Sequence, residues 1–208
     1  MLNTMSQRRR LTYVLVLNLA MITGLVVVGV TAHSLGVLAA GGDYVADSLA
    51  IILGLVAVYL RDRRGNAQAP TYVALINGLL LLAVTLFVLI QAVQRLATQN
   101  PEVHGLPVLI VSAVATGVML LGALILGRKA EHEDLHMRSV FLDTISDGLS
   151  SAAVAVVGGI IFLTHGLSWL DSVVAIAISV YIAFGAFKLL RDVARALRQG
   201  VPLDTDDD

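Results

Sequence analysis

The chain has 208 residues, of which 57% are hydrophobic and only 14% are charged, and its formal net charge is -1. Soluble domains carry about 25% charged residues, so this composition leaves too little polar surface for a water-soluble protein, and its wealth of apolar residues excludes disorder. The chain contains no cysteine, which excludes disulfides, thiolate metal sites and cysteine nucleophiles. The composition therefore predicts an integral membrane protein.

Six apolar stretches are each long enough to cross a bilayer, which takes about 20 residues. They cover residues 11–32, 35–60, 71–97, 107–127, 139–164 and 170–190. Segments rich in helix breakers, such as 65–70 and 100–107, separate neighbouring stretches. The predicted fold class is an all-α membrane protein, with a six-transmembrane-helix bundle over residues 1–198 and a short acidic C-terminal tail at 199–208.

The basic residues fall almost entirely on one side of this six-helix topology. Only Arg95 lies on the other side. The remaining thirteen of the 14 basic residues are Arg8, Arg9, Arg10, Arg61, Arg63, Arg64, Arg128, Lys129, Arg138, Lys188, Arg191, Arg195 and Arg198. The positive-inside rule then predicts that both termini are cytoplasmic and that the chain is a multi-pass protein of the cell membrane, the inner membrane if it is bacterial.

Two of the apolar stretches contain the same acidic pattern. Residues 42–49 read GDYVADSL and residues 142–149 read LDTISDGL, so each has Asp-x-x-x-Asp. On a helix, residues four apart lie on one face with Cβ atoms about 5–6 Å apart. Each span therefore presents a pair of carboxylates: Asp43 with Asp47, and Asp143 with Asp147.

These four carboxylates need a source of neutralising charge. An acid in the middle of a span costs about 2.5–3.5 kcal/mol on the insertion scale, and no lysine or arginine lies in the middle of any span. Protons, a bound cation or water must therefore offset the charge. Because like charges this close repel, the empty site is expected to hold protons that a divalent cation displaces, which is the chemistry of a cation/proton antiporter.

The motifs and their order resemble the cation diffusion facilitator family. The matching stretches are residues 34–47 and 141–151, with shorter matches at 74–78 and 170–175. The resemblance implies that Asp43, Asp47, Asp143 and Asp147 bind a transported divalent metal ion, which the protein exports from the cytoplasm in exchange for protons. It also implies a transporter and not an enzyme, with the metal as substrate and no cofactor.

The sequence departs from the family pattern in two respects. Family members often place histidine at one or two of the four ligand positions, where this chain has Asp43 and Asp143. Four oxygen ligands weaken the selectivity for zinc and admit manganese, iron, cobalt or cadmium, whereas the resemblance implies zinc and cadmium. We therefore expect zinc first and cadmium next, with weak discrimination. The family usually also carries a soluble C-terminal domain; this chain stops soon after its sixth span, which predicts a variant without that domain and a homodimer formed through the transmembrane helices.

The depth of the acids predicts where the fifth helix begins. Asp43 and Asp47 lie well inside their span, whereas Asp143 comes only a few residues after its apolar run begins. The two pairs can meet at one depth if the fifth helix starts before its apolar run, near residues 131–136. We therefore expect a helical extension there.

Other polar residues have less specific interpretations. His132 and His136 could collect metal at the cytoplasmic entrance, although a solvated helix start is the favoured interpretation, and the acidic tail is more readily read as a disordered, solubilising end. Asp171 is expected to cap the start of the sixth helix rather than to be a charge of an outer vestibule. Three histidines are expected to be ordinary residues of the outer connections: His33, His104 and His165.

Two rival functions also use acids within a membrane. An intramembrane aspartyl protease needs two aspartates, but its Gly-x-Gly-Asp signature fails at residues 40–43, which read AGGD. A proton-coupled exporter of organic cations would be expected to line its path with aromatic residues, and only 5% of this chain is aromatic. A purely structural role would leave four membrane carboxylates unexplained.

Overall fold

The computed structural model describes residues 7–64, 68–98, 102–130 and 135–199, and the side chains of Asp47 and Asp143 lie outside its described part. The described residues form six helices and no strand, which confirms the predicted all-α bundle. The helices are α1 (Gln7–Thr31), α2 (Leu35–Arg64), α3 (Ala69–Ala97), α4 (Gly105–Ala130), α5 (Leu135–Thr164) and α6 (Trp169–Gln199).

Length and hydropathy identify membrane-spanning helices among the described residues. Three segments are long and apolar enough to cross a bilayer, namely Thr71–Ala97, Ile145–Thr164 and Trp169–Gln199. Three further segments are apolar but shorter, namely Leu19–Thr31, Leu35–Ala46 and Gly105–Leu121. Together these segments belong to all six helices, so each helix of the bundle has an apolar portion.

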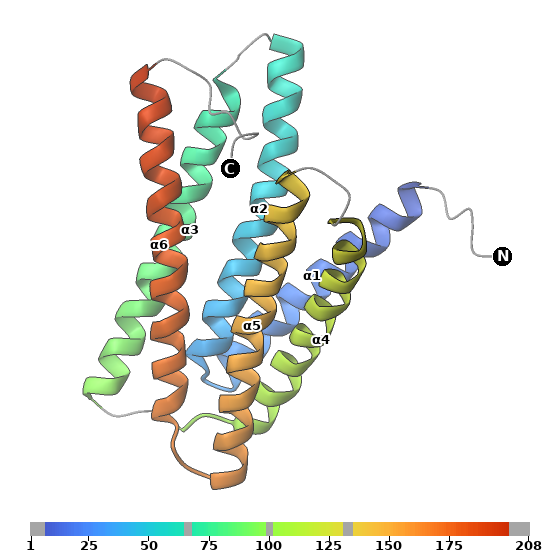
Figure 1. The fold of residues 1–208 in the computed structure, drawn as a ribbon. Coiled ribbons are helices and arrows are strands. Elements are labelled where there is room, and N and C mark those ends of the chain that lie inside the picture. The colour runs from blue at the N-terminus through green and yellow to red at the C-terminus, as the bar shows by residue number, and fades with distance from the viewer. Residues whose placement is uncertain (1–6, 65–67, 99–101, 131–134, 200–208) are drawn as a thin grey trace, which may run out of the picture.

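Successive helices run in opposite directions, so the connections alternate between the two ends of the bundle (Figure 1). We call the end that holds the α1–α2, α3–α4 and α5–α6 connections the turn end, and the opposite end the terminal end. Helix α4 packs along α5, and α3 packs along α6. Helix α2 is central because it contacts α1, α3, α5 and α6.

The fifth helix begins where the depth argument places it. Helix α5 starts at Leu135 and is continuous to Thr164. The expected helical extension before the apolar run is therefore confirmed. His136 is the second residue of α5, whereas its expected partner His132 lies outside the described residues, as does the acidic tail at 200–208.

Glycine lets α4 and α5 approach closely near the turn end. A methyl group in place of the Gly158 hydrogen would lie 2.7 Å from the backbone nitrogen of Leu109 and 2.7 Å from Val108 Cγ1. A methyl group on Gly105 would likewise overlap the backbone of Phe162. The two backbones therefore touch, which no residue with a Cβ atom would allow without moving a helix.

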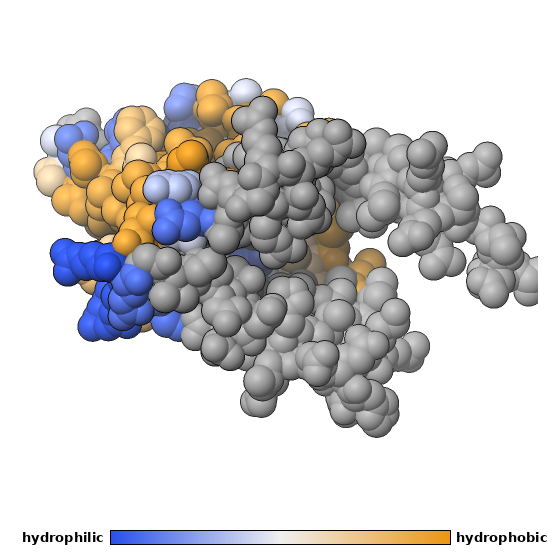
Figure 2. Space-filling view, turned by 90° about the horizontal axis from the view of Figure 1, so that it is seen from above, coloured by the Kyte–Doolittle hydropathy of each residue, from blue (hydrophilic) through white to orange (hydrophobic). Residues whose placement is uncertain are grey.

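Apolar side chains lie on the outside of the bundle as well as in its core. Leu25, Val37, Val108 and Val154 are fully buried between helices. Many other apolar side chains are exposed, and Leu149, Leu163 and Phe184 are each more than two thirds exposed. Figure 2 shows the bundle from the terminal end. Hydrophobic side chains, drawn in orange, cover much of the surface of the described residues in this view. Such a surface suits lipid and not water.

Candidate functional site

A close contact between α2 and α5 defines which faces of these helices meet. Gly36 is buried near the start of α2, and a methyl group on it would lie 3.4 Å from Val154 Cγ2 on α5. The same methyl group would lie 3.0 Å from Val174 Cγ1 and 3.1 Å from Asp171 Oδ1, both on α6. Gly36 therefore marks the junction of three helices, α2, α5 and α6, near the turn end.

This junction sets the register of the two acidic helices. Asp43 follows Gly36 by seven residues, and Asp147 precedes Val154 by seven residues. Because α2 and α5 run in opposite directions, both acids lie toward the terminal end from the contact, each by about 10 Å at about 1.5 Å per residue. Asp43 and Asp147 are therefore at the same level of the bundle.

The same spacing decides which way these acids face. Residues seven apart on a helix lie on nearly the same face. Asp43 thus lies on the face of α2 that carries Gly36, and Asp147 lies on the face of α5 that carries Val154. Neighbouring residues face elsewhere: a methyl group on Gly42 would meet Val84 of α3 at 3.0 Å. Sequence reasoning predicted the acids but could not give this register.

The structure describes two of the four predicted site side chains. Asp43 and Asp147 are both half-buried, as expected for groups inside the bundle and not on its flank. Asp47 and Asp143 belong to α2 and α5, but their side chains lie outside the described part. Among the side chains that are described, no group of three or more histidine, aspartate or glutamate residues is arranged to hold a metal ion.

A fifth acid, Asp171, corrects one expectation from the sequence. Asp171 lies in the first turn of α6 and is 1% exposed, but its carboxylate does not cap α6. Its Oδ1 accepts hydrogen bonds from Ser34 Oγ at 2.5 Å and from the Gly36 backbone nitrogen at 3.3 Å, and its Oδ2 accepts one from the Leu35 backbone nitrogen at 2.7 Å. The carboxylate therefore caps α2, because the first amides of a helix have no partner within the helix.

The α1–α2 connection is shaped for this cap. His33 has a φ of 55°, a left-handed conformation that ends α1, and the Ser34 backbone nitrogen then donates to the Gly29 carbonyl at 3.0 Å. Ser34 immediately caps the next helix, since its Oγ accepts from the Val37 backbone nitrogen at 3.1 Å. A serine directly before an apolar run is a helix-start signal, so sequence reasoning could have found Ser34.

Arg95, predicted as the only basic residue on its side of the membrane, lies at this same junction. Its Nη1 donates to the His33 carbonyl oxygen at 2.6 Å. Its charge also acts on Asp171 across the junction. Arg95 thus links the end of α3 to the cap between α6 and α2, a role that no local pattern in the sequence indicates.

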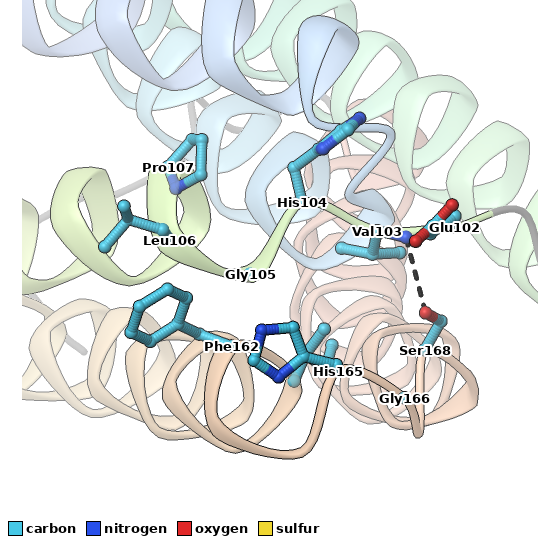
Figure 3. Close-up of a pocket in the computed structure, with 11 residues that line it drawn as sticks. Glu102, Val103, His104, Gly105, Leu106, Pro107, Phe162, His165, Gly166 and Ser168 are labelled. Carbon is cyan, nitrogen blue, oxygen red and sulfur yellow. Dashed lines mark hydrogen bonds between the residues drawn. The ribbon is translucent and has the colours of Figure 1, made fainter.

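A cavity of about 270 Å³ opens between the α3–α4 and α5–α6 connections at the turn end (Figure 3). His104 and His165 are among its lining residues, and the Val103 backbone nitrogen donates to Ser168 Oγ at 3.3 Å on one side of it. Both histidines are exposed and lie in connections, as does His33, which agrees with the sequence expectation for all three. The cavity lies away from the level of Asp43 and Asp147.

Comparison with known proteins matches nearly the whole chain. The family model described as the cation efflux transmembrane domain matches residues 11–198. A cadmium, cobalt and zinc/H(+)-K(+) antiporter of Bacillus velezensis is 26% identical over 93% of this chain, and the zinc transporter ZitB of Yersinia pestis is 29% identical over 86%. The metal cation efflux system protein CzcD of Cupriavidus metallidurans is 27% identical over 87%.

The relatives are longer than this chain. The alignments cover 65% of the Bacillus velezensis protein, 59% of the Yersinia pestis protein and 58% of the Cupriavidus metallidurans protein. The matching family model describes a transmembrane domain, and its match reaches all six helices of this chain. As the motifs predict, the chain belongs to the cation efflux, or cation diffusion facilitator, family of transporters and is a multi-pass protein of the cell membrane.

Proposed function

We propose that the protein exports divalent metal cations from the cytoplasm in exchange for protons, with zinc as the first substrate and cadmium as the next. Manganese, iron and cobalt are weaker candidates. Membership of a transporter family supports transport rather than catalysis, and the names of the relatives support zinc, cadmium and cobalt as cargo. In this proposal the metal is substrate, and the protein needs no cofactor.

The ligands in this proposal are Asp43, Asp47, Asp143 and Asp147. The observation that supports them best is the common register of α2 and α5, by which Asp43 and Asp147 lie at one level and on facing sides of two helices in contact. The spacing of four residues predicts that Asp47 and Asp143 continue the same faces one turn nearer the terminal end. Four carboxylates at two adjoining levels would suit a tetrahedral divalent ion.

Exchange for protons follows from the chemistry of carboxylates in a membrane. Bound metal requires deprotonated ligands, so metal must displace protons to bind, and protons must return when it leaves. Metal affinity is therefore expected to fall as the pH falls. Titration calorimetry of the purified protein with zinc in buffers of different ionisation enthalpy would measure the protons released per ion bound.

We further propose that both termini are cytoplasmic, so that the turn end faces outward. The distribution of basic residues supports this orientation. Residues 1–198 would form the transport unit and 199–208 an acidic tail, and two copies would pair through the apolar flanks of their transmembrane helices. Crosslinking in the membrane tests the homodimer, and labelling of cysteines introduced at either end of the bundle tests the orientation.

The decisive experiment is metal flux in proteoliposomes that contain a pH-sensitive dye. Asp147→Ala or Asp47→Ala should abolish metal-driven proton movement, while the protein still reaches the membrane. Asp192→Ala is the matched control, because Asp192 lies near the end of α6 in a surface ion pair with Arg195. Wild-type flux in either site variant would refute the proposal. Peptide cleavage, or drug transport without metal, would favour the two rival functions.

A further inference from the structure

Ser151 lies on the same face of α5 as Asp147, nearer the turn end. Ser151 follows Asp147 by four residues and precedes Val154 by three, so all three lie on one face. One helical turn, about 6 Å, separates Ser151 from Asp147. Ser151 is 1% exposed, which places a polar group deep inside the bundle between the aspartate level and the junction at Gly36.

The hydroxyl of Ser151 is not used locally. Its Oγ has no hydrogen-bond partner among the described residues. Other hydroxyls on these helices bond to the carbonyl four residues earlier, as do Thr23, Thr116 and Thr164 at 2.7–2.8 Å. A buried hydroxyl without a partner costs free energy, and each such group calls for an explanation such as a bound water or ion.

The neighbouring helices provide no hydrogen-bond partner for Ser151 Oγ among the described residues. The α2–α5 register pairs Gly36 with Val154 and therefore places Ala39 level with Ser151. The α4–α5 register, set by Gly148 against Met119, places Ala115 and Thr116 near the same level, and the Thr116 hydroxyl donates to the Ser112 carbonyl of its own helix at 2.8 Å. Both alanines are buried and neither can accept or donate a hydrogen bond through its side chain. No described side chain at this level therefore bonds to Ser151 Oγ, and a bound water or ion would satisfy it.

We infer that Ser151 Oγ binds the transported divalent cation on the turn-end side of the aspartates. This inference rests on the proposed function and extends it by one step of the path. A hydroxyl is a neutral oxygen ligand, so it can replace one water of the ion without holding the ion by charge. A weak site at Ser151 beside the strong aspartate site would help release, because a transported ion must dissociate as well as bind.

Ser151→Cys gives a direct test, because the chain has no cysteine of its own. A thiol is close in size to a hydroxyl but is a soft ligand, which favours cadmium over manganese. Ser151→Cys should raise the ratio of cadmium to manganese transport in proteoliposomes by about threefold or more. Cadmium should also protect this single thiol from alkylation by a maleimide.

Ser179→Cys is the matched control. Ser179 on α6 is also fully buried, and its Oγ also has no partner among the described residues, but it does not belong to the acidic faces of α2 and α5. This variant should keep the wild-type metal ratio, and cadmium should not protect its thiol. If both cysteine variants behaved alike, the inference would be overturned.

Ser151→Ala tests the native hydroxyl without adding a thiol. Alanine fills the site without strain, so the variant should fold and should lower kcat/KM for zinc by about three- to tenfold. An unchanged kcat/KM would overturn the inference while leaving the proposed function intact, provided that Asp147→Ala abolishes flux. If Asp147→Ala transported metal, the proposed function itself would fail.

Discussion

The turn end and the middle of the bundle contain buried acids in two different settings. At the turn end, Asp171 is fully buried but accepts three hydrogen bonds from the start of α2. It also interacts electrostatically with Arg95. In the middle, Asp43 and Asp147 lie within apolar helices, at one level and on facing sides. Asp171 stabilises the fold by capping α2, whereas we propose that Asp43 and Asp147 bind an ion from solution.

Helix chemistry explains the difference. The first amides of a helix have no partner within it, so a carboxylate placed there gains several donors and the favourable end of the helix dipole. In the middle of a helix every backbone N–H already bonds to the carbonyl four residues earlier, so no backbone amide can neutralise a carboxylate there. An acid's position along the helices therefore indicates whether the backbone can stabilise its charge.

The largest effects are expected when the capping acid Asp171 and the site acid Asp147 are each replaced by asparagine. Asp171→Asn puts a donor where Oδ1 or Oδ2 now accepts, so it should lower the free energy of unfolding by about 1.5–3 kcal/mol. At about 2–4 °C per kcal/mol, its Tm in detergent should fall by several degrees. Asp147→Asn should lower the Tm less than Asp171→Asn does, because it leaves no backbone amides of a helix start without their acceptor, but it should abolish metal flux.

The contrast between the two acids requires that Asp171→Asn mainly lowers stability and that Asp147→Asn mainly abolishes metal flux. Thermal unfolding followed by tryptophan fluorescence, together with flux in proteoliposomes, gives both readouts for each protein. A loss of stability in Asp147→Asn that equals the loss in Asp171→Asn would show that both acids are structural. The contrast between the two regions would then be wrong.

A smaller effect is expected where the turn end is closely packed. In Gly158→Ala the new methyl group would lie 2.7 Å from the Leu109 backbone nitrogen, so α4 and α5 must separate. We expect a loss of about 1–3 kcal/mol in the free energy of unfolding, as for other overpacked sites. Gly159→Ala is the control, because its methyl group would meet Leu109 at an ordinary 3.7 Å.

The control should be neutral or slightly stabilising, since alanine is favoured over glycine within a helix by about 1 kcal/mol. Chemical denaturation of both variants in the same detergent measures the difference. If the two alanine variants were equally stable, the close fit of α4 and α5 at the turn end would not stabilise the protein.

The fold followed closely from the sequence because each helix is a long apolar run bounded by breakers. The early start of α5 also followed, since the depth of Asp143 required it. The partner of Asp171 did not follow: α2 begins 136 residues before it along the chain, and local patterns describe only the helix that a residue belongs to. For the same reason the spacing of the acids predicted their faces but not the level at which α2 and α5 meet.

The smallest effect is expected at Arg95, which supports the cap from outside. Arg95→Gln would lose the hydrogen bond to the His33 carbonyl and the charge near Asp171, but the three hydrogen bonds of Asp171 would remain. We expect a loss of about 1 kcal/mol in the free energy of unfolding and no change in metal flux. Arg95→Lys should recover part of the stability, because it restores the charge. A loss as large as that of Asp171→Asn would mean that the arginine, and not the amides of α2, provides most of the stabilisation of the buried carboxylate.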